Sequence, residues 1–114
     1  MSAADPAVIR VSLPKELEAQ GLAIVQAEGR DIVVVSVDGV LRAIDRWCPH
    51  EDGDLGEGMM FRGDIKCPVH GYIFSLTKGR CLNAFGMVAR IYGVEVHGGD
   101  LLLTELSQPA GRGL

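Results

Sequence analysis

The sequence predicts an all-β protein made of short antiparallel strands. Apolar residues alternate with polar ones in several short stretches, pairs of turn-forming residues separate these stretches, and a helical pattern is confined to residues 14–21. The chain has 114 residues, the length of a single domain with one small core. We therefore expect one domain over residues 1–114, with its core at about 8–105 and a loose C-terminal tail at 106–114.

The N-terminal part predicts one strand followed by one short helix. In residues 7–13, Ile9, Val11 and Leu13 alternate with polar side chains, which is the period of a half-buried strand. Residues 14–21 begin with a proline, which suits the first position of a helix, and end at a glycine.

Five further strands are expected, at residues 22–26, 31–37, 40–45, 88–96 and 100–106. Asp38-Gly39 stands between two of them and favours a two-residue hairpin turn, because glycine readily takes a positive φ. His97-Gly98-Gly99 is a second hairpin signal, in which His97 is interpreted as an exposed turn residue. Strands from the two ends of the chain are therefore expected to share one core.

Residues 47–86 have a different composition. They contain few long apolar runs and many Gly, Pro, Asp and Cys residues. This composition is typical of loops that something other than a hydrophobic face holds in place.

Composition and charge exclude several classes of function. Lys and Arg number 11 against 15 Asp and Glu, and the formal net charge of −4 disfavours binding to nucleic acid or to a membrane surface. The chain starts without the basic and apolar regions of a signal peptide, and no apolar run reaches membrane-spanning length, so we expect a cytoplasmic protein. In that reducing compartment three cysteines are expected to be ligands or thiols rather than a disulfide framework.

Two short motifs supply metal-ligating side chains. Cys48 and His50 form Cys-x-His, and after 16 residues Cys67 and His70 form Cys-x-x-His. Each cysteine is followed by a proline, which fixes φ at a bend, and Gly71 after the second motif can take the backbone angles of a tight loop. The pattern predicts two loops that each present one thiolate and one imidazole to a common centre. A structural zinc site is an alternative, because two cysteines and two histidines also suit tetrahedral zinc.

These motifs resemble those of the Rieske iron–sulfur proteins. The resemblance covers roughly residues 8–105, and it extends to Leu55, Gly71, Phe74 and Gly79, which stand where such domains commonly carry these residue types. It implies an antiparallel β-sandwich with a small cluster-binding subdomain, at about residues 47–86, formed by two loops. It also implies one [2Fe-2S] cluster per chain.

The resemblance implies a role for each of the four ligands. Cys48 and Cys67 match the thiolate ligands of one iron, and His50 and His70 match the imidazole ligands of the other iron. A third loop covers the cluster in this family, and the matching segment here, residues 82–89, lacks the usual proline. Ala84 to Met87 are the residues that would shield the cluster.

The departures from high-potential members of the family predict a low reduction potential. Neither loop has a second cysteine, and Tyr72 and Phe74 stand where those proteins carry the Ser and Tyr hydroxyls that bond the cluster sulfurs. We expect Tyr72 to pack outward. Residues 51–57 add four carboxylates, whose field opposes the arrival of an electron. The expected midpoint is about −150 mV, at the low end of the Rieske range.

Other features have plainer interpretations. Cys81 is interpreted as a small buried hydrophobe, and Trp47 as a residue that packs the base of the first loop. The acidic run 51–57 is either a solvated loop or a docking surface.

Function follows from the cluster. We find no nucleophile, acid–base pair or phosphate-binding loop in the sequence, so we expect an electron carrier with no catalytic residues rather than an enzyme. Rieske oxygenases need a second domain, for which the chain leaves no room. The resemblance favours the ferredoxin component of an aromatic-ring dioxygenase system, where Asp52 also matches, passing electrons from a flavin-dependent ferredoxin reductase to a terminal oxygenase in transient complexes. The small subunit of an assimilatory nitrite reductase is the alternative.

Overall fold

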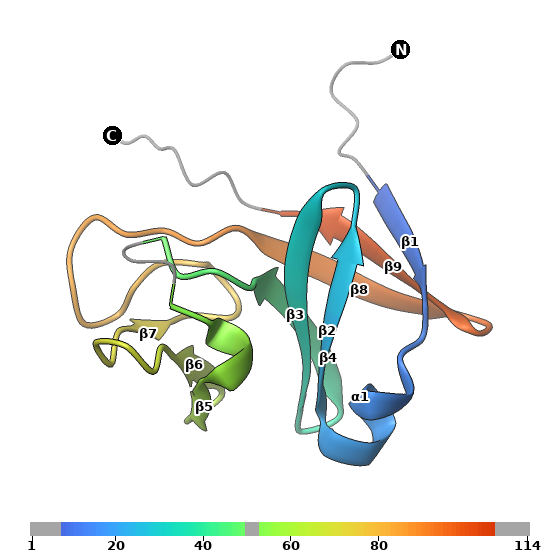
Figure 1. Ribbon diagram of the computed structural model, residues 1–114, viewed down its shortest axis with the longest axis horizontal. Helices are drawn as coiled ribbons and strands as arrows, with labels where there is room; N and C mark the ends of the chain where they lie inside the picture. The colour runs from blue at the N-terminus through green and yellow to red at the C-terminus, as the bar shows by residue number, and fades with distance from the viewer. Residues whose placement is uncertain (1–7, 50–52, 107–114) are drawn as a thin grey trace, which may run out of the picture.

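The structure is a computed structural model that describes residues 8–49 and 53–106, and within these residues it contains two antiparallel sheets and one short α-helix (Figure 1). The large sheet has six strands in the order β1 (Val8–Ser12), β9 (Asp100–Glu105), β8 (Ile91–His97), β4 (Val40–Asp45), β3 (Arg30–Val37) and β2 (Leu22–Ala27). The small sheet consists of β5 (Met59–Phe61), β6 (Asp64–Lys66) and β7 (Ile73–Phe74). The helical pieces are α1 (Lys15–Gln20) and the 3₁₀ turn η1 (Leu55–Glu57).

The first and last strands lie side by side in the large sheet. Ile9 on β1 pairs with Leu103 on β9, and both side chains are buried. Strands from the two chain ends therefore share one core, and the predicted all-β antiparallel fold class is confirmed.

Both predicted hairpins form with glycine in the turn. Asp38 and Gly39 have φ of 52° and 82° and join β3 to β4, which extends the β2–β3 hairpin into the expected meander. The second turn consists of Gly98 and Gly99 alone, because His97 pairs with Asp100 as the last residue of β8. His97 is exposed, as predicted, although it belongs to the strand.

The helix α1 stops at a glycine, as predicted. Gly21 has a left-handed φ of 75°, and its N–H donates to the Leu17 carbonyl at 2.9 Å. Pro14 precedes the first helical residue instead of occupying the first position. Leu17 is the buried side chain of α1, and it anchors the helix to the large sheet.

Both faces of the large sheet are buried where it passes through β3. Ile32 and Val34 face a core formed by β1, β2, β4, β8, β9 and α1, which we call the sheet core. Val33 and Val35 face the opposite core, which includes Cys48, Cys67 and Phe74 and which we call the loop core. This arrangement explains why β3 reads as a nearly continuous apolar run. It also places Cys48, Cys67 and the other described residues of the loop core on the face of β3 that carries Val33 and Val35.

A polar cross-link holds four strands together at the edge of the sheet core. The Tyr92 hydroxyl donates to Asp45 Oδ1 at 2.6 Å and accepts from Arg30 Nη1 at 3.1 Å, and Arg30 also pairs with Glu105 at 2.9 Å. Burial, together with the hydrogen bond to Asp45, raises the pKa of Tyr92 to about 12. The site described below therefore rests on strands that are tied to one another.

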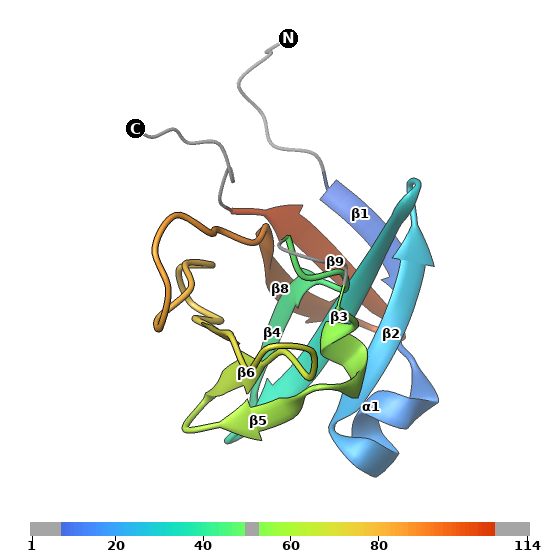
Figure 2. The same ribbon diagram turned by 60° about the vertical axis from the view of Figure 1, so that its left-hand side comes forward.

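The small sheet differs from the sequence-based expectation, which placed only loops at residues 47–86. Its strands are two or three residues long, too short for an alternating pattern to emerge. Ile65 on β6 and Phe74 on β7 are fully buried in the loop core. Figure 2 shows β5 and β6 at the end of the molecule away from β1.

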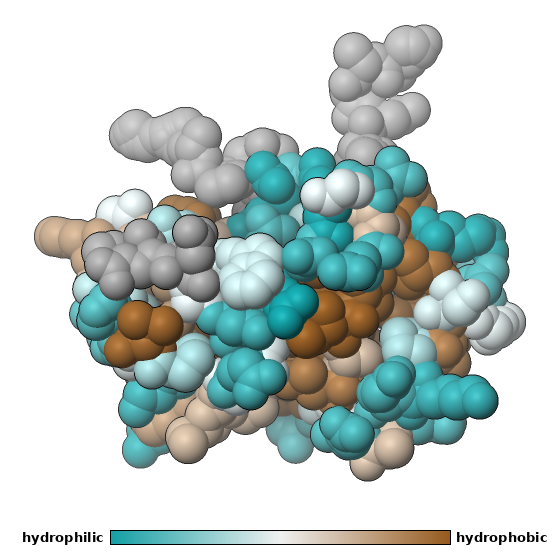
Figure 3. Space-filling model, viewed as in Figure 1, coloured by the Kyte–Doolittle hydropathy of each residue, from teal (hydrophilic) through white to brown (hydrophobic). Residues whose placement is uncertain are grey.

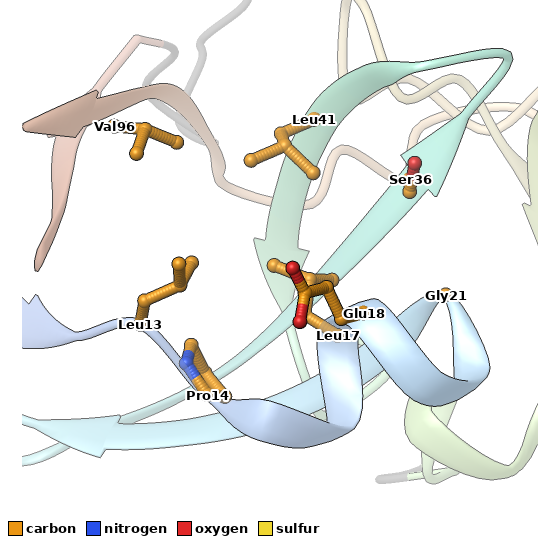
Figure 4. A pocket seen from close by; sticks show the side chains of 8 residues that line it. All are labelled: Leu13, Pro14, Leu17, Glu18, Gly21, Ser36, Leu41 and Val96. Carbon is orange, nitrogen blue, oxygen red and sulfur yellow. The ribbon is translucent and has the colours of Figure 1, made fainter. Parts of the chain in front are cut away.

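Outside the loops, the surface of the described residues has a hollow and scattered hydrophobic side chains. A hollow of about 450 Å³ lies beside α1, with Leu13, Leu41 and Val96 among its lining residues (Figure 4). Figure 3 shows hydrophobic residues at the surface over β2 and β3, between hydrophilic ones.

Among the described residues, no helix is both long and apolar enough to cross a bilayer. Leu106 donates its N–H to the Ile91 carbonyl, and the rest of the predicted tail lies outside the described residues, so the domain boundaries stay a prediction.

Candidate metal centre

The first predicted ligand loop leaves the end of β4 and is closed by backbone hydrogen bonds. Cys48 N–H donates to the Gly53 carbonyl at 2.7 Å, and Leu55 N–H donates to the Arg46 carbonyl at 2.7 Å. Cys48 is 2% exposed, so the loop turns its cysteine into the loop core. His50 lies outside the described residues.

An ion pair locks the base of this loop. Arg46 donates from Nε and Nη2 to the two Asp54 carboxylate oxygens at 3.0 and 2.9 Å, and Asp54 Oδ1 also accepts from Gly56 N–H at 2.8 Å. The hydrogen bonds from Arg46 hold the pKa of Asp54 below its ordinary value. The Arg46 guanidinium also lies 4.5 Å from the ring centre of Trp47, whose indole N–H donates to Asp31 at 2.9 Å. Trp47 thus packs at the base of the loop, as predicted, while remaining 42% exposed.

The acidic run beside this loop is less uniform than the sequence suggests. Glu51 and Asp52 lie outside the described residues, and Asp54 forms an ion pair with Arg46. Glu57 is exposed on η1. The field of four carboxylates expected from the sequence therefore contains one that is neutralised by its partner.

The second predicted ligand loop joins β6 to β7. Cys67 N–H donates to the Tyr72 carbonyl at 2.8 Å, and Gly71 N–H donates to the Cys67 carbonyl at 3.0 Å. Gly71 has a positive φ of 75°, which confirms the tight loop predicted there. Cys67 is 1% exposed, whereas His70 is exposed on the outside of the loop.

Tyr72 is placed differently from the prediction that it packs outward. It is partly buried against the loop core, and its ring lies 5.7 Å from that of His70, tilted by 53°. Its aromatic body gains more by covering apolar side chains than by facing water. Phe74 is fully buried, as a side chain without a hydroxyl can be.

The two loops meet at Gly53. A Cβ added at Gly53 would stand 2.5 Å from Cys67 Sγ and 2.8 Å from Val69 Cγ2. Only a residue without a side chain allows this approach, which brings the first loop against the second cysteine. Cys48 and Cys67 consequently share the loop core, with His70 following on the surface.

The third loop, residues 82–89, covers the loop core. Ala84 and Met87 pack against the same cluster of side chains as the two cysteines, whereas Phe85 between them is fully exposed. Cys81 is 6% exposed and donates its thiol to Asn83 Oδ1 at 3.3 Å, so the prediction of a buried cysteine is confirmed. Sequence reasoning missed Arg46, Gly53 and Asn83, because each acts on a residue of another segment and no local pattern marks it.

The described residues contain no group of three or more His, Cys, Asp or Glu side chains arranged around one metal position. His50, the fourth predicted ligand, is outside this search.

Comparison with protein families identifies the arrangement. The model of the Rieske [2Fe-2S] domain matches residues 7–99, which span both ligand loops, the third loop and most of the large sheet. The chain belongs to the Rieske [2Fe-2S] domain family. The resemblance inferred from the two motifs is thereby confirmed.

Two curated relatives show how this Rieske domain is used elsewhere. The ferredoxin component of the naphthalene 1,2-dioxygenase system of Pseudomonas aeruginosa is 28% identical over 80 residues, or 69% of this chain and 77% of that protein. The cholesterol 7-desaturase nvd of Hemicentrotus pulcherrimus is 33% identical over 61 residues. That match covers 52% of this chain but 13% of the desaturase, so the similarity is limited to one part of a larger protein.

Solved structures with the same fold include two different kinds of protein. A complex of reduced oxygenase and oxidised ferredoxin in carbazole 1,9a-dioxygenase contains a chain that matches with a TM-score of 0.72 and 24% identity, over 84% of this chain and 93% of that one. A putative NADH-dependent nitrite reductase small subunit from Mycobacterium tuberculosis matches with a TM-score of 0.72 and 16% identity, over 90% and 98%. At these identities the matches establish the Rieske-like fold and nothing further.

The described residues fit a Rieske cluster. The cofactor of this family is a [2Fe-2S] cluster, whose cysteine and histidine ligands belong to different irons. Cys48 and Cys67 are buried thiols in one apolar core, and the close approach at Gly53 brings their two loops together there. His70, predicted as a ligand of the second iron, is exposed.

Proposed function

We propose that this Rieske protein is a one-electron carrier, the ferredoxin component of a multicomponent oxygenase system of the aromatic-ring dioxygenase type. The supporting observation is the placement of its predicted ligands, with two thiols buried in the loop core and a histidine exposed at the surface. This layout suits a centre that is shielded from water on one side and open to a partner on the other. The similarity to the naphthalene dioxygenase ferredoxin component, over 77% of that protein, points in the same direction.

The proposed ligands are Cys48 and Cys67 for one iron and His50 and His70 for the other. Bound there, the cluster supplies reversible one-electron oxidation and reduction. The chain holds the two thiolates in the apolar loop core, and the backbone hydrogen bonds to the carbonyls of Gly53 and Tyr72 fix both loops. The exposed imidazole edge of His70 is the proposed exit for electrons.

The partners proposed for this protein are a flavin-dependent ferredoxin reductase and a terminal oxygenase. Both complexes are transient, because a shuttle must leave one partner before it meets the next. The chain itself carries no catalytic residue in this proposal, and its location is the cytoplasm.

The test combines metal analysis with electron paramagnetic resonance of the dithionite-reduced protein. We expect two irons and two sulfides per chain and the low-average-g rhombic signal of mixed Cys and His ligation. Cys67→Ser removes the signal, whereas Cys81→Ser retains it, because Cys81 is also buried but lies outside the proposed ligand set. One zinc per chain and no signal would instead establish the structural zinc module.

The partner is tested separately. The purified protein, reduced by a naphthalene dioxygenase-type reductase, should pass single electrons to the matching oxygenase. The nitrite reductase small subunit shares the fold, and co-purification with a large sirohaem subunit would replace the ferredoxin proposal with that alternative.

A further inference from the structure

The side chain of Asn83 connects the third loop to the second ligand loop. Its Oδ1 accepts from Ile73 N–H at 2.9 Å, and its Nδ2 donates to the Gly71 carbonyl at 3.0 Å. The same Oδ1 accepts from the Cys81 thiol at 3.3 Å. The exposed Asn83 side chain thus forms hydrogen bonds both with the second ligand loop and with Cys81, just before the third loop.

The hydrogen bonds of the Asn83 side chain extend the backbone pairing between β7 and residues 81–82. Phe74 and Cys81 form a bridge, and Leu82 N–H donates to the Ile73 carbonyl at 2.7 Å. Beyond Leu82 the chain bends away from β7 into the third loop. The amide of Asn83 then stands in for a backbone peptide, accepting and donating where the next strand residue would have done so.

The bonded groups belong to the cover and to the ligand loop. Gly71 directly follows His70, and its own N–H closes the second ligand loop on Cys67. On the other side, Ala84 and Met87 follow Asn83 and pack against the core that holds the predicted thiolate ligands. Loss of the Asn83 amide would therefore free the cover from the loop it protects.

We propose that Asn83 is a positioning residue that holds the third loop over the thiolate side of the metal centre and limits the access of water to it. This inference rests on the proposed function, because it concerns the properties of the bound cluster. It assigns Asn83 no contact with the cluster itself.

Water access has two measurable consequences. A reduced centre carries one more negative charge than the oxidised centre, and water stabilises the more highly charged form, so a loosened cover raises the reduction potential. Water and chelators also reach the thiolates more easily, so the cluster is lost faster. Both effects are expected without a large change in global stability, because Asn83 is exposed and its removal leaves no cavity.

The experiment compares Asn83→Ala and Asn83→Leu with native protein and with Phe85→Ala. Leucine keeps the branched shape of asparagine but has no hydrogen-bonding group. Phe85 is a fully exposed residue of the same loop and serves as the matched control. The readouts are the midpoint potential, the rate of cluster loss to a chelator, the melting temperature and hydrogen exchange at Ile73 N–H. Exchange at Ile73 is measurable whether or not a cluster is bound.

In both Asn83 variants, we expect hydrogen exchange at Ile73 N–H and the loss of the cluster to be about fivefold faster than in the native protein. This factor is the effect expected from one exposed hydrogen-bonded contact. Their midpoint should rise, while Phe85→Ala matches the native protein. The inference is overturned if exchange at Ile73 is native in both variants, or if the midpoint potential and the rate of cluster loss are both native. It is also overturned if Asn83→Leu behaves as the native protein in all these readouts. If the native protein binds no cluster, the proposed function fails by itself and exchange at Ile73 still decides whether Asn83 holds the loop.

Discussion

At the residue scale, the absence of a side chain at Gly53 decides how the two ligand loops meet. The Cβ of any other residue would stand 2.5 Å from Cys67 Sγ, well inside the contact distance of real atoms. The neighbouring Val69 side chain, at 2.8 Å, leaves no room for the added group to turn aside. Gly53 therefore belongs to the site as much as the cysteines do, although it supplies no ligand.

The first prediction is that Gly53→Ala separates the loops. The overlap forces a backbone shift, and we expect a loss of about 1–3 kcal/mol in the free energy of unfolding together with a lower iron content per chain. Denaturant unfolding and iron analysis measure the two effects. Gly99→Ala is the control, because a Cβ at Gly99 meets nothing within 4 Å. Native iron content and stability in Gly53→Ala would contradict the prediction.

At the element scale, the two ligand loops are held by different forces. The first loop is clamped by the bidentate ion pair between Arg46 and Asp54, and the second by backbone hydrogen bonds and the amide of Asn83. An ion pair responds to pH, whereas amide hydrogen bonds do not over the same range. Acid should therefore weaken the first loop before the second.

The second prediction concerns this pH dependence. Because the pKa of Asp54 is lower in the folded protein than in the unfolded chain, the stabilisation is present above the unfolded value, near pH 4, and is lost as the pH falls through the lower folded value. Asp54→Asn should lower the free energy of unfolding by about 1 kcal/mol at pH 7, because a partly exposed ion pair contributes no more than this. The difference in stability between the variant and the native protein should shrink below about pH 4. Urea unfolding at several pH values provides the measurement.

A control variant separates this clamp from an ordinary surface pair. Asp100 also pairs with an arginine, Arg10, but the two side chains are 36% and 60% exposed, so Asp100→Asn should change stability little at any pH. A constant difference between native protein and Asp54→Asn from pH 7 to pH 3 would show that the ion pair is not the origin of the effect.

At the scale of the whole molecule, we expect the fold and the net charge to influence both the reduction potential and the encounter with partners. The loop core presents Phe74 and Tyr72 near the cysteines, and the large sheet holds the loops at one end of the molecule (Figure 1). The net charge of −4 favours approach to a basic surface. The β8–β9 turn, between His97 and Asp100, lies at the opposite end of the large sheet from the loops (Figure 1).

The third prediction is a low midpoint potential. Phe74 has no hydroxyl to offer a cluster sulfur, and hydrogen bonds of that kind raise the potential in this family. We expect a midpoint of about −150 mV, near the bottom of the Rieske range, in a spectroscopic redox titration. A clearly positive value would mean that another donor, such as the Tyr72 hydroxyl, reaches the cluster.

The fourth prediction is that the acidic run steers the reductase. A variant that combines Glu51→Gln, Asp52→Asn and Glu57→Gln should be reduced about threefold to tenfold more slowly at low ionic strength and at the native rate in high salt. Asp54 stays unchanged because it holds the first loop. Stopped-flow reduction by the partner reductase provides the rates.

The control for this prediction carries the same change in net charge on the other side of the molecule. It combines Glu18→Gln on α1 with Glu95→Gln on β8 and Asp100→Asn on β9, next to the β8–β9 turn. If both triple variants slow the reaction equally, net charge alone is responsible, and residues 51–57 return to the interpretation of a solvated loop.

The sequence by itself determined the strands of the large sheet and both hairpin turns, and it also predicts the four ligands, whose roles stay a prediction. Alternation and glycine turns are local signals, and ligand chemistry depends on side-chain type and spacing, so each can be recognised within a few residues. The same local reading failed for β5, β6 and β7, because strands this short carry no period. It also misplaced Tyr72, whose environment comes from distant segments.

Only the tertiary structure decided how these parts become a site. The approach of Gly53 to Cys67 and the bonds from Asn83 to Gly71 and Ile73 each join one segment to another across a loop. The burial of β3 on both faces likewise depends on what packs against each side, with Val33 facing the loop core. Such contacts depend on the relative positions of whole elements, which packing fixes only when the chain has folded.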